Sequence, residues 1–141
     1  MANEATPAPT VTTVHHLVDR RFIGIAPDGM RVMMDGEQEA QTGMRPMQLL
    51  LNAVGGCAAY DIVQMIGKRR LTINDYRIEL RGERASGTPA YFTHIHAVHH
   101  FDVPGLTKAQ AERFVELGMT KYCSVAASLK AEISFEVVLA E

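Results

Sequence analysis

The spacing of hydrophobic residues changes several times along this chain, and each change marks an expected element of secondary structure. Between residues 10 and 35, apolar side chains recur at short intervals, and a Pro-Asp-Gly sequence at residues 27–29 separates two such runs. Runs of this kind joined by a proline- and glycine-containing turn are typical of antiparallel strands. We therefore expect a β-meander over residues 10–35, with a hairpin at residues 27–30.

A long helix is predicted from Pro46 to the basic residues 68–70. Proline fits the first turn of a helix, where its missing N–H costs nothing, and positive charge suits a helix C-terminus. Leu50, Val54 and Cys57 follow one another at helical spacing. The Cys57 sulfur should therefore share a stripe with apolar side chains and face the core or a cleft.

Two adjacent glycines interrupt this helical pattern beside Cys57. Each of Gly55 and Gly56 is about 1 kcal/mol less favourable than alanine in a helix interior. Either the helix is kinked there, or another segment or chain passes so close that no Cβ fits. Local conflicts of this kind are expected at functional sites.

The second half of the chain alternates apolar and polar residues with a period of two. The alternation at residues 76–81, 91–103 and 133–139 predicts three strands, with a connection at residues 86–89. In the middle strand the mainly apolar face carries Ile95, Ala97, Phe101 and Val103. These strands should therefore form a half-buried sheet.

Two further helices are expected between the second and third of these strands. Thr107 and Gln110 have the spacing of a capping box, which starts a helix that we expect to continue to about Met119. Ser124 could cap a short third helix reaching Lys130. The order of elements predicts an α+β fold.

Length and composition limit the domain organisation and the function. The 141 residues, 47% of them hydrophobic, suffice for one domain, which we place at residues 10–141 after a disordered tail at residues 1–9. A net charge of −2 gives no basic field for nucleic acid or anionic membrane. No apolar run approaches the roughly 18 residues that span a bilayer, and no secretory signal is evident, so we expect a cytoplasmic protein with small substrates.

Two cysteines are the best candidates for chemistry. Cys57 lies on the apolar stripe of the long helix, where a small buried hydrophobe is the alternative interpretation. Cys123 is placed near the N-terminus of the short helix, a position that favours the thiolate, with an inert thiol as the alternative. If the fold brings the two sulfurs together, they could break a peroxide.

Other kinds of site receive less support. His94, His96 and His100 share one face of a predicted strand, and such spacing can bind zinc, but a solvated strand face is the better account. The chain has no Gly-x-Ser-x-Gly elbow, no phosphate-binding loop and no dinucleotide fingerprint, which leaves chemistry without a bound cofactor. The Arg20-Arg21 doublet belongs to a solvated strand edge or reaches a site, where it would stabilise a thiolate.

Four segments together resemble one protein family. Residues 43–57, 76–84, 92–95 and 121–125 are similar to the corresponding segments of the OsmC/Ohr family of osmotically inducible and organic hydroperoxide resistance proteins, and within it to the YhfA-like branch. The resemblance covers nearly all of the chain after the tail. It implies an intertwined homodimer in which β-sheets wrap two long central helices and the active sites lie at the subunit interface. This would explain Gly55-Gly56.

The resemblance also implies an activity. Family members reduce organic hydroperoxides with two cysteines, no bound cofactor and an external dithiol. By position, Cys57 would be the peroxidatic and Cys123 the resolving thiol, and Arg20, with Arg21 as its neighbour, would be the catalytic arginine.

One departure from the family pattern concerns the partner of that arginine. The hydroperoxide reductases carry a glutamate just after the helix proline, whereas this chain has Met47 followed by Gln48. An amide at Gln48 would not supply a charge-assisted pair. A small-molecule binding or redox-sensing protein on the same scaffold is therefore the alternative function.

Overall fold

The computed structural model describes residues 5–141, and the contacts within the chain divide it into two units that meet in the sequence between Leu49 and Leu50. Residues 5–9 of the predicted tail are exposed and form no helix or strand; residues 1–4 lie outside the described residues. Strands and helices are both present, as the α+β prediction requires, and the strands form two separate sheets.

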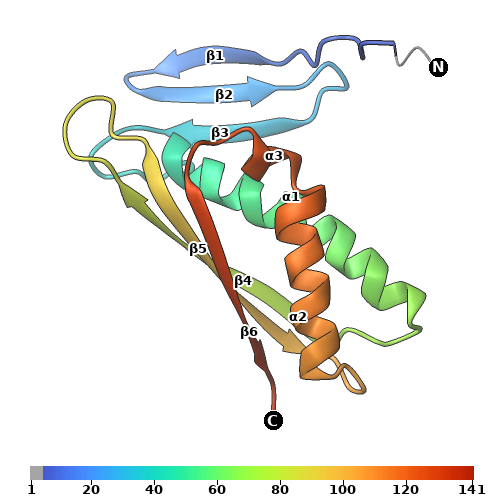
Figure 1. The fold of residues 1–141 in the computed structure, drawn as a ribbon. Helices are drawn as coiled ribbons and strands as arrows, with labels where there is room; N and C mark the ends of the chain where they lie inside the picture. Colours follow the sequence, from blue (N-terminus) through green and yellow to red (C-terminus); the bar gives the residue numbers. More distant parts are fainter. Residues whose placement is uncertain (1–4) are drawn as a thin grey trace. The chain divides into compact units, whose positions relative to one another are not determined.

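The first unit contains the predicted β-meander. Strands β1 (Thr13–Val18), β2 (Arg21–Ile25) and β3 (Arg31–Asp35) form an antiparallel sheet in that order, visible in Figure 1. The hairpin between β2 and β3 is closed by the Ala26 N–H, which donates to the Met30 carbonyl at 2.9 Å. Gly29 in this turn has a φ of 90°, a value that favours glycine.

Helix α1 (Pro46–Lys68) has 23 residues and begins at the predicted proline. Its buried stripe consists of Val54, Ala58, Ile62 and Ile66, which recur every four residues and have no exposed surface. The unit boundary falls within this helix, so its first four residues belong to the first unit and the rest to the second.

By length and composition α1 is apolar enough to cross a membrane. A stretch of 18 residues within it has a mean hydropathy of 1.4, and 28% of that stretch is buried. The expectation that no segment approaches this threshold is therefore wrong, because alanines and glycines keep the mean hydropathy high without an unbroken run of large apolar residues. Core helices of soluble proteins pass the same test. This helix by itself gives the protein no clear membrane character.

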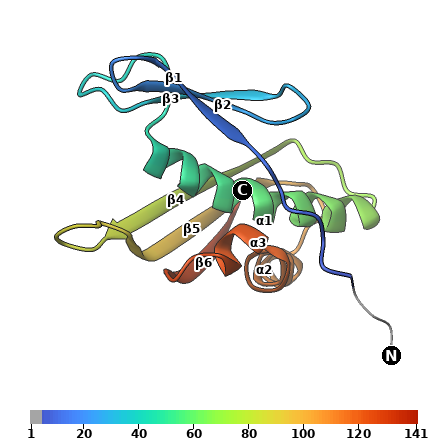
Figure 2. The same cartoon turned by 90° about the horizontal axis from the view of Figure 1, so that it is seen from above.

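The second unit contains a sheet with two helices on one face. Strands β4 (Asp75–Arg84) and β5 (Phe92–Asp102) form an antiparallel hairpin, and β6 (Glu132–Leu139) joins β5 in parallel, giving the order β4-β5-β6. Helix α2 (Lys108–Glu116), the π-helix η1 (Leu117–Tyr122) and α3 (Ser124–Ala127) precede β6. Figure 2 shows α2 nearly end-on, running across α1.

The capping box at the start of α2 is confirmed. The Gln110 N–H donates to Thr107 Oγ1 at 3.2 Å, and the Thr107 N–H donates to Gln110 Oε1 at 3.1 Å. Two other predictions here are wrong. The helix expected to reach Met119 changes to π-helical hydrogen bonding after Glu116, and the short third helix is capped by Cys123, because its sulfur rather than the Ser124 hydroxyl accepts the capping hydrogen bond.

Close packing explains one of the two helical glycines. A Cβ on Gly55 would lie 2.7 Å from Leu80 Cδ1 of strand β4, so the predicted close approach is present there. A Cβ on Gly56 would meet nothing within 4 Å of the described chain. The sequence pattern missed Gly118 in η1, where a Cβ would lie 2.7 Å from Ile62 Cγ1; this glycine allows α1 and η1 to cross closely.

Candidate thiol site

The second unit brings the two cysteines into direct interaction. Cys57 lies in the middle of α1 and is partly exposed, whereas Cys123 lies between η1 and α3 with only 4% of its surface exposed. The Cys57 side chain is a hydrogen-bonding and electrostatic neighbour of the Cys123 thiol. Both sulfurs are free thiols in this structure. Residues 66 positions apart in the sequence are thus gathered at one place.

Two backbone groups fix the Cys123 sulfur. It donates to the Val54 carbonyl of α1 at 3.5 Å and accepts from the Ala126 N–H at 3.4 Å. Burial raises the pKa of the Cys123 thiol; the Ala126 N–H acts in the opposite direction, and the Cys57 thiol raises the pKa further. The expectation of a stabilised Cys123 thiolate is therefore wrong, because the loss of solvent outweighs the capping N–H.

This arrangement divides the chemistry between the sulfurs. Since its pKa is raised, Cys123 keeps its proton at neutral pH and serves as a hydrogen-bond donor. The more exposed Cys57 is the thiol that a dissolved reagent reaches first. A sulfenic acid on Cys57 would form beside the Cys123 thiol, which is the cysteine that interacts with it.

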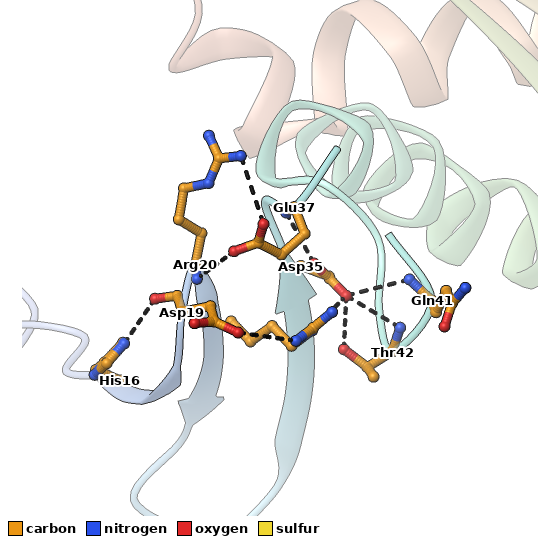
Figure 3. Close-up of polar contacts among 8 residues, drawn as sticks. His16, Asp19, Arg20, Asp35, Glu37, Gln41 and Thr42 are labelled. Atoms are coloured by element: carbon orange, nitrogen blue, oxygen red, sulfur yellow. Dashed lines mark hydrogen bonds and ion pairs between the residues drawn. The ribbon is translucent and has the colours of Figure 1, made fainter. Parts of the chain in front are cut away.

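The arginine doublet lies in the first unit, at the turn between β1 and β2, and its two side chains differ in exposure and in their partners. The Arg20 side chain is 67% exposed, and its Nη2 is 3.6 Å from Glu37 Oε2. The Arg20 backbone N–H also donates to Glu37 Oε1 at 2.8 Å, which is the main reason why the pKa of Glu37 is lowered. Arg20 is therefore a solvated side chain tied to the loop after β3 (Figure 3).

Arg21 is held more firmly than Arg20. Its side chain is 26% exposed, its Nε donates to Asp35 Oδ2 at 3.1 Å, and its Nη1 is 3.5 Å from Asp19 Oδ2. Asp19 has a φ of 51°, the left-handed conformation that turns the chain between β1 and β2. Two carboxylates thus bind one guanidinium at this turn.

Asp35 is the centre of the polar contacts drawn in Figure 3 and has no exposed surface. Its Oδ1 accepts from the Glu37 N–H at 2.9 Å, and its Oδ2 accepts from the Thr42 hydroxyl at 2.8 Å and from the N–H groups of Gln41 and Thr42 at 3.2 Å each. The Glu37 N–H is the largest contribution that holds the pKa of Asp35 well below its usual range, against the opposing effect of burial.

Sequence reasoning missed this carboxylate. It considered the helix positions Met47 and Gln48 for the partner of an arginine, but Gln48 Oε1 accepts the Arg45 backbone N–H at 3.0 Å. Asp35 ends a predicted strand, where a single acidic residue is usually solvated. The one possible signal for a buried Asp35 was the polar, glycine-containing loop that follows it. This loop folds back and donates three N–H groups to the carboxylate.

Two of the histidines predicted on the polar face of β5 lie within hydrogen-bonding distance of residues of β6. His94 Nε2 and His96 Nδ1 lie 2.8 and 2.7 Å from the Ser134 hydroxyl, and His96 Nε2 lies 3.2 Å from Glu136 Oε1. Among residues 5–141, no group of three or more His, Cys, Asp or Glu side chains could hold a metal ion. The sequence favoured a solvated strand face; in the structure His94 and His96 are partly exposed and hydrogen-bonded.

A fully buried histidine was overlooked. His99 has the same parity as Ile95 and Phe101 and therefore faces the helices. Its Nδ1 is 2.7 Å from the Tyr76 hydroxyl oxygen, and the Tyr76 ring stacks on Phe101 with a centroid distance of 4.4 Å. The parity of residue 99 in the alternating strand was the signal that could have identified it.

The comparisons with known proteins agree on one protein family. The sequence pattern of the family described as OsmC-like protein matches residues 36–138. Protein YhfA of Escherichia coli strain K12 is 38% identical over 125 residues, covering 84% of this chain and 91% of the relative.

Two solved structures extend the comparison to the fold. The OsmC-like protein of Mycoplasma pneumoniae superposes with a TM-score of 0.79 at 19% identity, covering 96% of this chain and all of the other. A structure described as an organic hydroperoxide resistance protein OsmC from Legionella pneumophila has a TM-score of 0.65 at 14% identity, covering 97% of this chain and 100% of the other.

Proposed function

Because the chain belongs to the OsmC-like protein family, we propose that it is a thiol-dependent peroxidase that reduces organic hydroperoxides. The observation that carries the proposal is the direct interaction of two free thiols of unequal burial, Cys57 and Cys123. Two structural neighbours, from Legionella pneumophila and Bacillus subtilis, are described as organic hydroperoxide resistance proteins. The name of the E. coli relative states no activity.

The first step is the oxidation of Cys57. Its thiolate attacks the terminal oxygen of the hydroperoxide, a sulfur–oxygen bond forms, and the oxygen–oxygen bond breaks. The sulfur loses two electrons and becomes a sulfenic acid, while the leaving alkoxide takes a proton and departs as the alcohol. The partial exposure of Cys57 supports its assignment to this step.

The second step uses Cys123 as the resolving thiol. Its sulfur attacks the sulfenic sulfur, a disulfide forms, and water leaves with the thiol proton and the sulfenic hydroxyl. An external dithiol then reduces the disulfide by exchange and is itself oxidised to a disulfide. No bound cofactor is needed. The raised pKa of Cys123 supports this order, because a protonated thiol competes poorly for the peroxide.

Arg21, rather than Arg20, is the arginine that we assign to the peroxide. A guanidinium held by Asp35 and Asp19 keeps one orientation, whereas the exposed Arg20 must first be ordered. Asp35 would take the part played in the hydroperoxide reductases by the glutamate that this chain lacks. On this assignment, Asp35 of strand β3 would supply the charge-assisted pair that the helix position lacks.

The functional unit that we propose is a cytoplasmic homodimer with its active sites at the subunit interface. Helix α1 exposes a stripe made of Gly56, Tyr60, Val63 and Gly67, of which Tyr60 is 68% and Val63 43% exposed. A Cβ on either glycine would meet nothing within 4 Å in the described chain. A helix from a second copy would bury this stripe and use the absence of side chains at its glycines.

Steady-state turnover tests the peroxidase function. Catalytic amounts of protein with a dithiol should consume many equivalents of cumene hydroperoxide, and faster than hydrogen peroxide. Cys57→Ser should abolish turnover. Cys123→Ser should complete one oxidation and accumulate a sulfenic acid that a dimedone probe detects by mass. If both variants retain full activity, the assignment is wrong.

The arginine assignment has a matched pair of variants. Arg21→Lys keeps the charge but loses the bidentate fork, and should lower kcat/KM for the hydroperoxide by about tenfold or more. Arg20→Lys is the control and should change it little. A binding or redox-sensing protein, the alternative function, would bind or react once with the hydroperoxide but show no turnover with any dithiol.

A further inference from the structure

One serine hydroxyl lies between two histidines on the sheet of the second unit. Ser134 Oγ of β6 is 2.7 Å from His96 Nδ1 and 2.8 Å from His94 Nε2, both on β5. The other ring nitrogen of His96, Nε2, is 3.2 Å from Glu136 Oε1. A serine, a histidine and a carboxylate are thus joined in a row by two hydrogen bonds.

The pairing of β5 with β6 produces this row. The strands are parallel, with His96 opposite Ser134. Since alternate residues of a strand share a face, His94 and Glu136 project from the same side of the sheet as these two. Ala97, of opposite parity, is fully buried on the side that faces the helices. The homodimer contact proposed above uses the exposed stripe of α1, which lies on that other side of the sheet.

The hydrogen-bonding capacity of each group fixes where the protons lie. A carboxylate only accepts, so Glu136 accepts from His96 Nε2–H, and in the neutral imidazole Nδ1 is then an acceptor. The Ser134 hydroxyl must therefore donate to His96 Nδ1. Since a hydroxyl has one proton, His94 Nε2–H is the donor at the second contact with Ser134. The serine thus directs its proton at a histidine that a carboxylate orients.

This row of groups has the geometry that makes a serine nucleophilic. The hydroxyl and its base lie within about 2.6–3.2 Å of each other in such sites, and a third group orients the base. Both distances here fall in that range. The serine faces Nδ1 of His96 and the carboxylate faces Nε2, and either ring nitrogen can take a proton. A triad is recognised by geometry and roles and not by sequence position, so the missing Gly-x-Ser-x-Gly elbow does not exclude it.

A cavity of about 510 Å³ opens beside the serine, since His94 forms part of its wall. The other lining residues come from the strands of the second unit and the loops beside them: Glu83, Tyr91, Thr93, Lys130 and Glu132. Lys130 Nζ lies 3.8 Å from the centre of the Tyr91 ring. Because these side chains are polar or aromatic, the cavity suits a short acyl or alkoxy group better than a long hydrocarbon chain.

We propose that Ser134 is the nucleophile of a second catalytic site, which hydrolyses small carboxylic esters with short acyl chains and uses His96 as its base. Ser134 Oγ attacks the carbonyl carbon, and its proton passes to His96 Nδ1. The bond from carbon to the alkoxy oxygen then breaks, and the alcohol leaves with that proton. Water attacks the acyl-serine and gives a proton to His96, and the acid departs as Ser134 recovers its proton.

The two remaining groups have different parts. His94 Nε2–H, 2.8 Å from the reacting oxygen, donates to the carbonyl oxygen as negative charge develops there. One imidazole N–H is a weaker oxyanion site than the usual pair of backbone N–H groups, so turnover should be slow and should favour esters with a good leaving group. Glu136 is a positioning residue, since it acts through His96. The site does not depend on the proposed peroxidase function.

Ester hydrolysis by the intact reduced protein tests the proposal. The protein should hydrolyse p-nitrophenyl acetate, and faster than p-nitrophenyl octanoate. Ser134→Ala and His96→Gln should each lower kcat/KM by about tenfold or more. Two matched controls should leave it unchanged. The Ser128 hydroxyl donates to a backbone carbonyl, so Ser128→Ala removes a serine without a histidine partner. His100→Gln removes a histidine of the same face that lies opposite a valine.

A fluorophosphonate probe separates the serine from the thiols. Ser134 Oγ attacks phosphorus, its proton passes to His96, and fluoride leaves. Peptide mass spectrometry should find the adduct on Ser134 in the wild-type protein and no adduct in His96→Gln. Label spread over several serines, or no ester hydrolysis at all, would overturn the proposal. So would hydrolysis that persists in Ser134→Ala and is lost after alkylation with iodoacetamide, because it would then belong to a cysteine.

The positioning role of Glu136 has its own measurement. Glu136→Gln should lower kcat and leave KM unchanged. In ¹⁵N NMR spectra the His96 ring should be the Nε2–H tautomer in the wild-type protein and a mixture of tautomers in the variant. An Nδ1–H tautomer in the wild-type protein would contradict the proton order on which the mechanism rests and would overturn it.

Discussion

The two units of this chain hold their sheets together in opposite ways. In the first, every residue of β1 is exposed, and Asp35 is a buried carboxylate at the end of β3, surrounded by donors. In the second, β5 buries Ile95, Ala97 and Phe101 under two helices. One sheet is organised by charge and hydrogen bonds, and the other by apolar burial.

This difference indicates which of the two units contributes more to the stability of the fold. A three-stranded sheet needs an apolar face packed against something to be stable. The first unit exposes several large apolar side chains, including Val14, Leu17 and Val32. Its polar cluster fixes local geometry but supplies no hydrophobic free energy. We therefore expect the second unit to dominate the free energy of unfolding and the first to open more easily.

Phe101→Ala should have the largest effect on stability. The ring is 2% exposed and stacks on Tyr76, so its removal leaves a cavity in the core of the second unit. We expect a loss of about 3–5 kcal/mol in the free energy of unfolding, measured by urea denaturation. Val14→Ala in the exposed β1 is the control and should change it by less than about 0.5 kcal/mol. Similar losses from the two variants would remove the contrast between the units.

The second prediction is a pH dependence that belongs to the second unit. The His99 pKa is lowered by burial from 6.5 to about 4, so between these values the unfolded chain binds a proton that the folded chain does not. Stability should be complete above pH 6.5 and fall by on the order of 3 kcal/mol as the pH drops to about 4. Urea denaturation at pH 7 and pH 4.5 measures this.

A pair of histidine variants tests whether His99 is the cause of this slope of stability against pH. His99→Gln cannot titrate, so its stability should change much less between pH 7 and 4.5. His15→Gln removes an exposed histidine of β1 and should keep the wild-type slope. An unchanged slope in His99→Gln would assign the effect to other groups.

The third prediction concerns the polar cluster of the first unit. Asp35→Asn replaces an acceptor with an amide and leaves the Arg21 guanidinium without its buried partner. Hydrogen exchange at the amides of residues 13–44 should accelerate by about tenfold or more, with amides of β5 unaffected. Asp28→Asn, in the hairpin turn, is the control. The pKa of Asp35 is lowered, so its contribution should be present above pH 4 and lost only as the pH falls further.

The smallest expected effect is at the start of α2. Thr107→Ala removes the capping hydroxyl and should lower the free energy of unfolding by about 1 kcal/mol. Thr107→Ser keeps the hydroxyl and should restore most of the loss. Equal stability of the two variants would mean that the capping box contributes nothing measurable.

Elements with a strong local signal could be predicted from the sequence. The meander, the start of α1 at Pro46 and the Thr107 capping box depend on residues only a few positions apart. The parallel pairing of β6 with β5 and the separation of the strands into two sheets depend on distant contacts and left no trace in the periodicity. Local patterns define elements but not their partners.

The candidate site shows the same limit. The two cysteines were identified from their context, but the direction of the Cys123 pKa shift depends on burial by groups far away in the sequence. The Arg21–Asp35 pair joins residues 14 apart across two strands, and no spacing rule identifies it. His99 lies with its neutral ring on the buried, apolar face of β5, although a polar residue type is ordinarily expected on the exposed face.

The π-helix between α2 and Cys123 has a consequence for sequence variation. Each π-type turn accommodates one more residue than an α-helical turn, and such insertions often occur next to functional sites. Loss of a single codon in Leu117–Tyr122 would therefore be absorbed as the segment becomes ordinary α-helix, with the side chains before and after it left in place. One added codon would have no such turn to absorb it, and it would rotate the Cys123 sulfur by about 100° around the helix axis, away from Cys57. The meeting of the two thiols thus depends on how many residues this segment contains as much as on which ones.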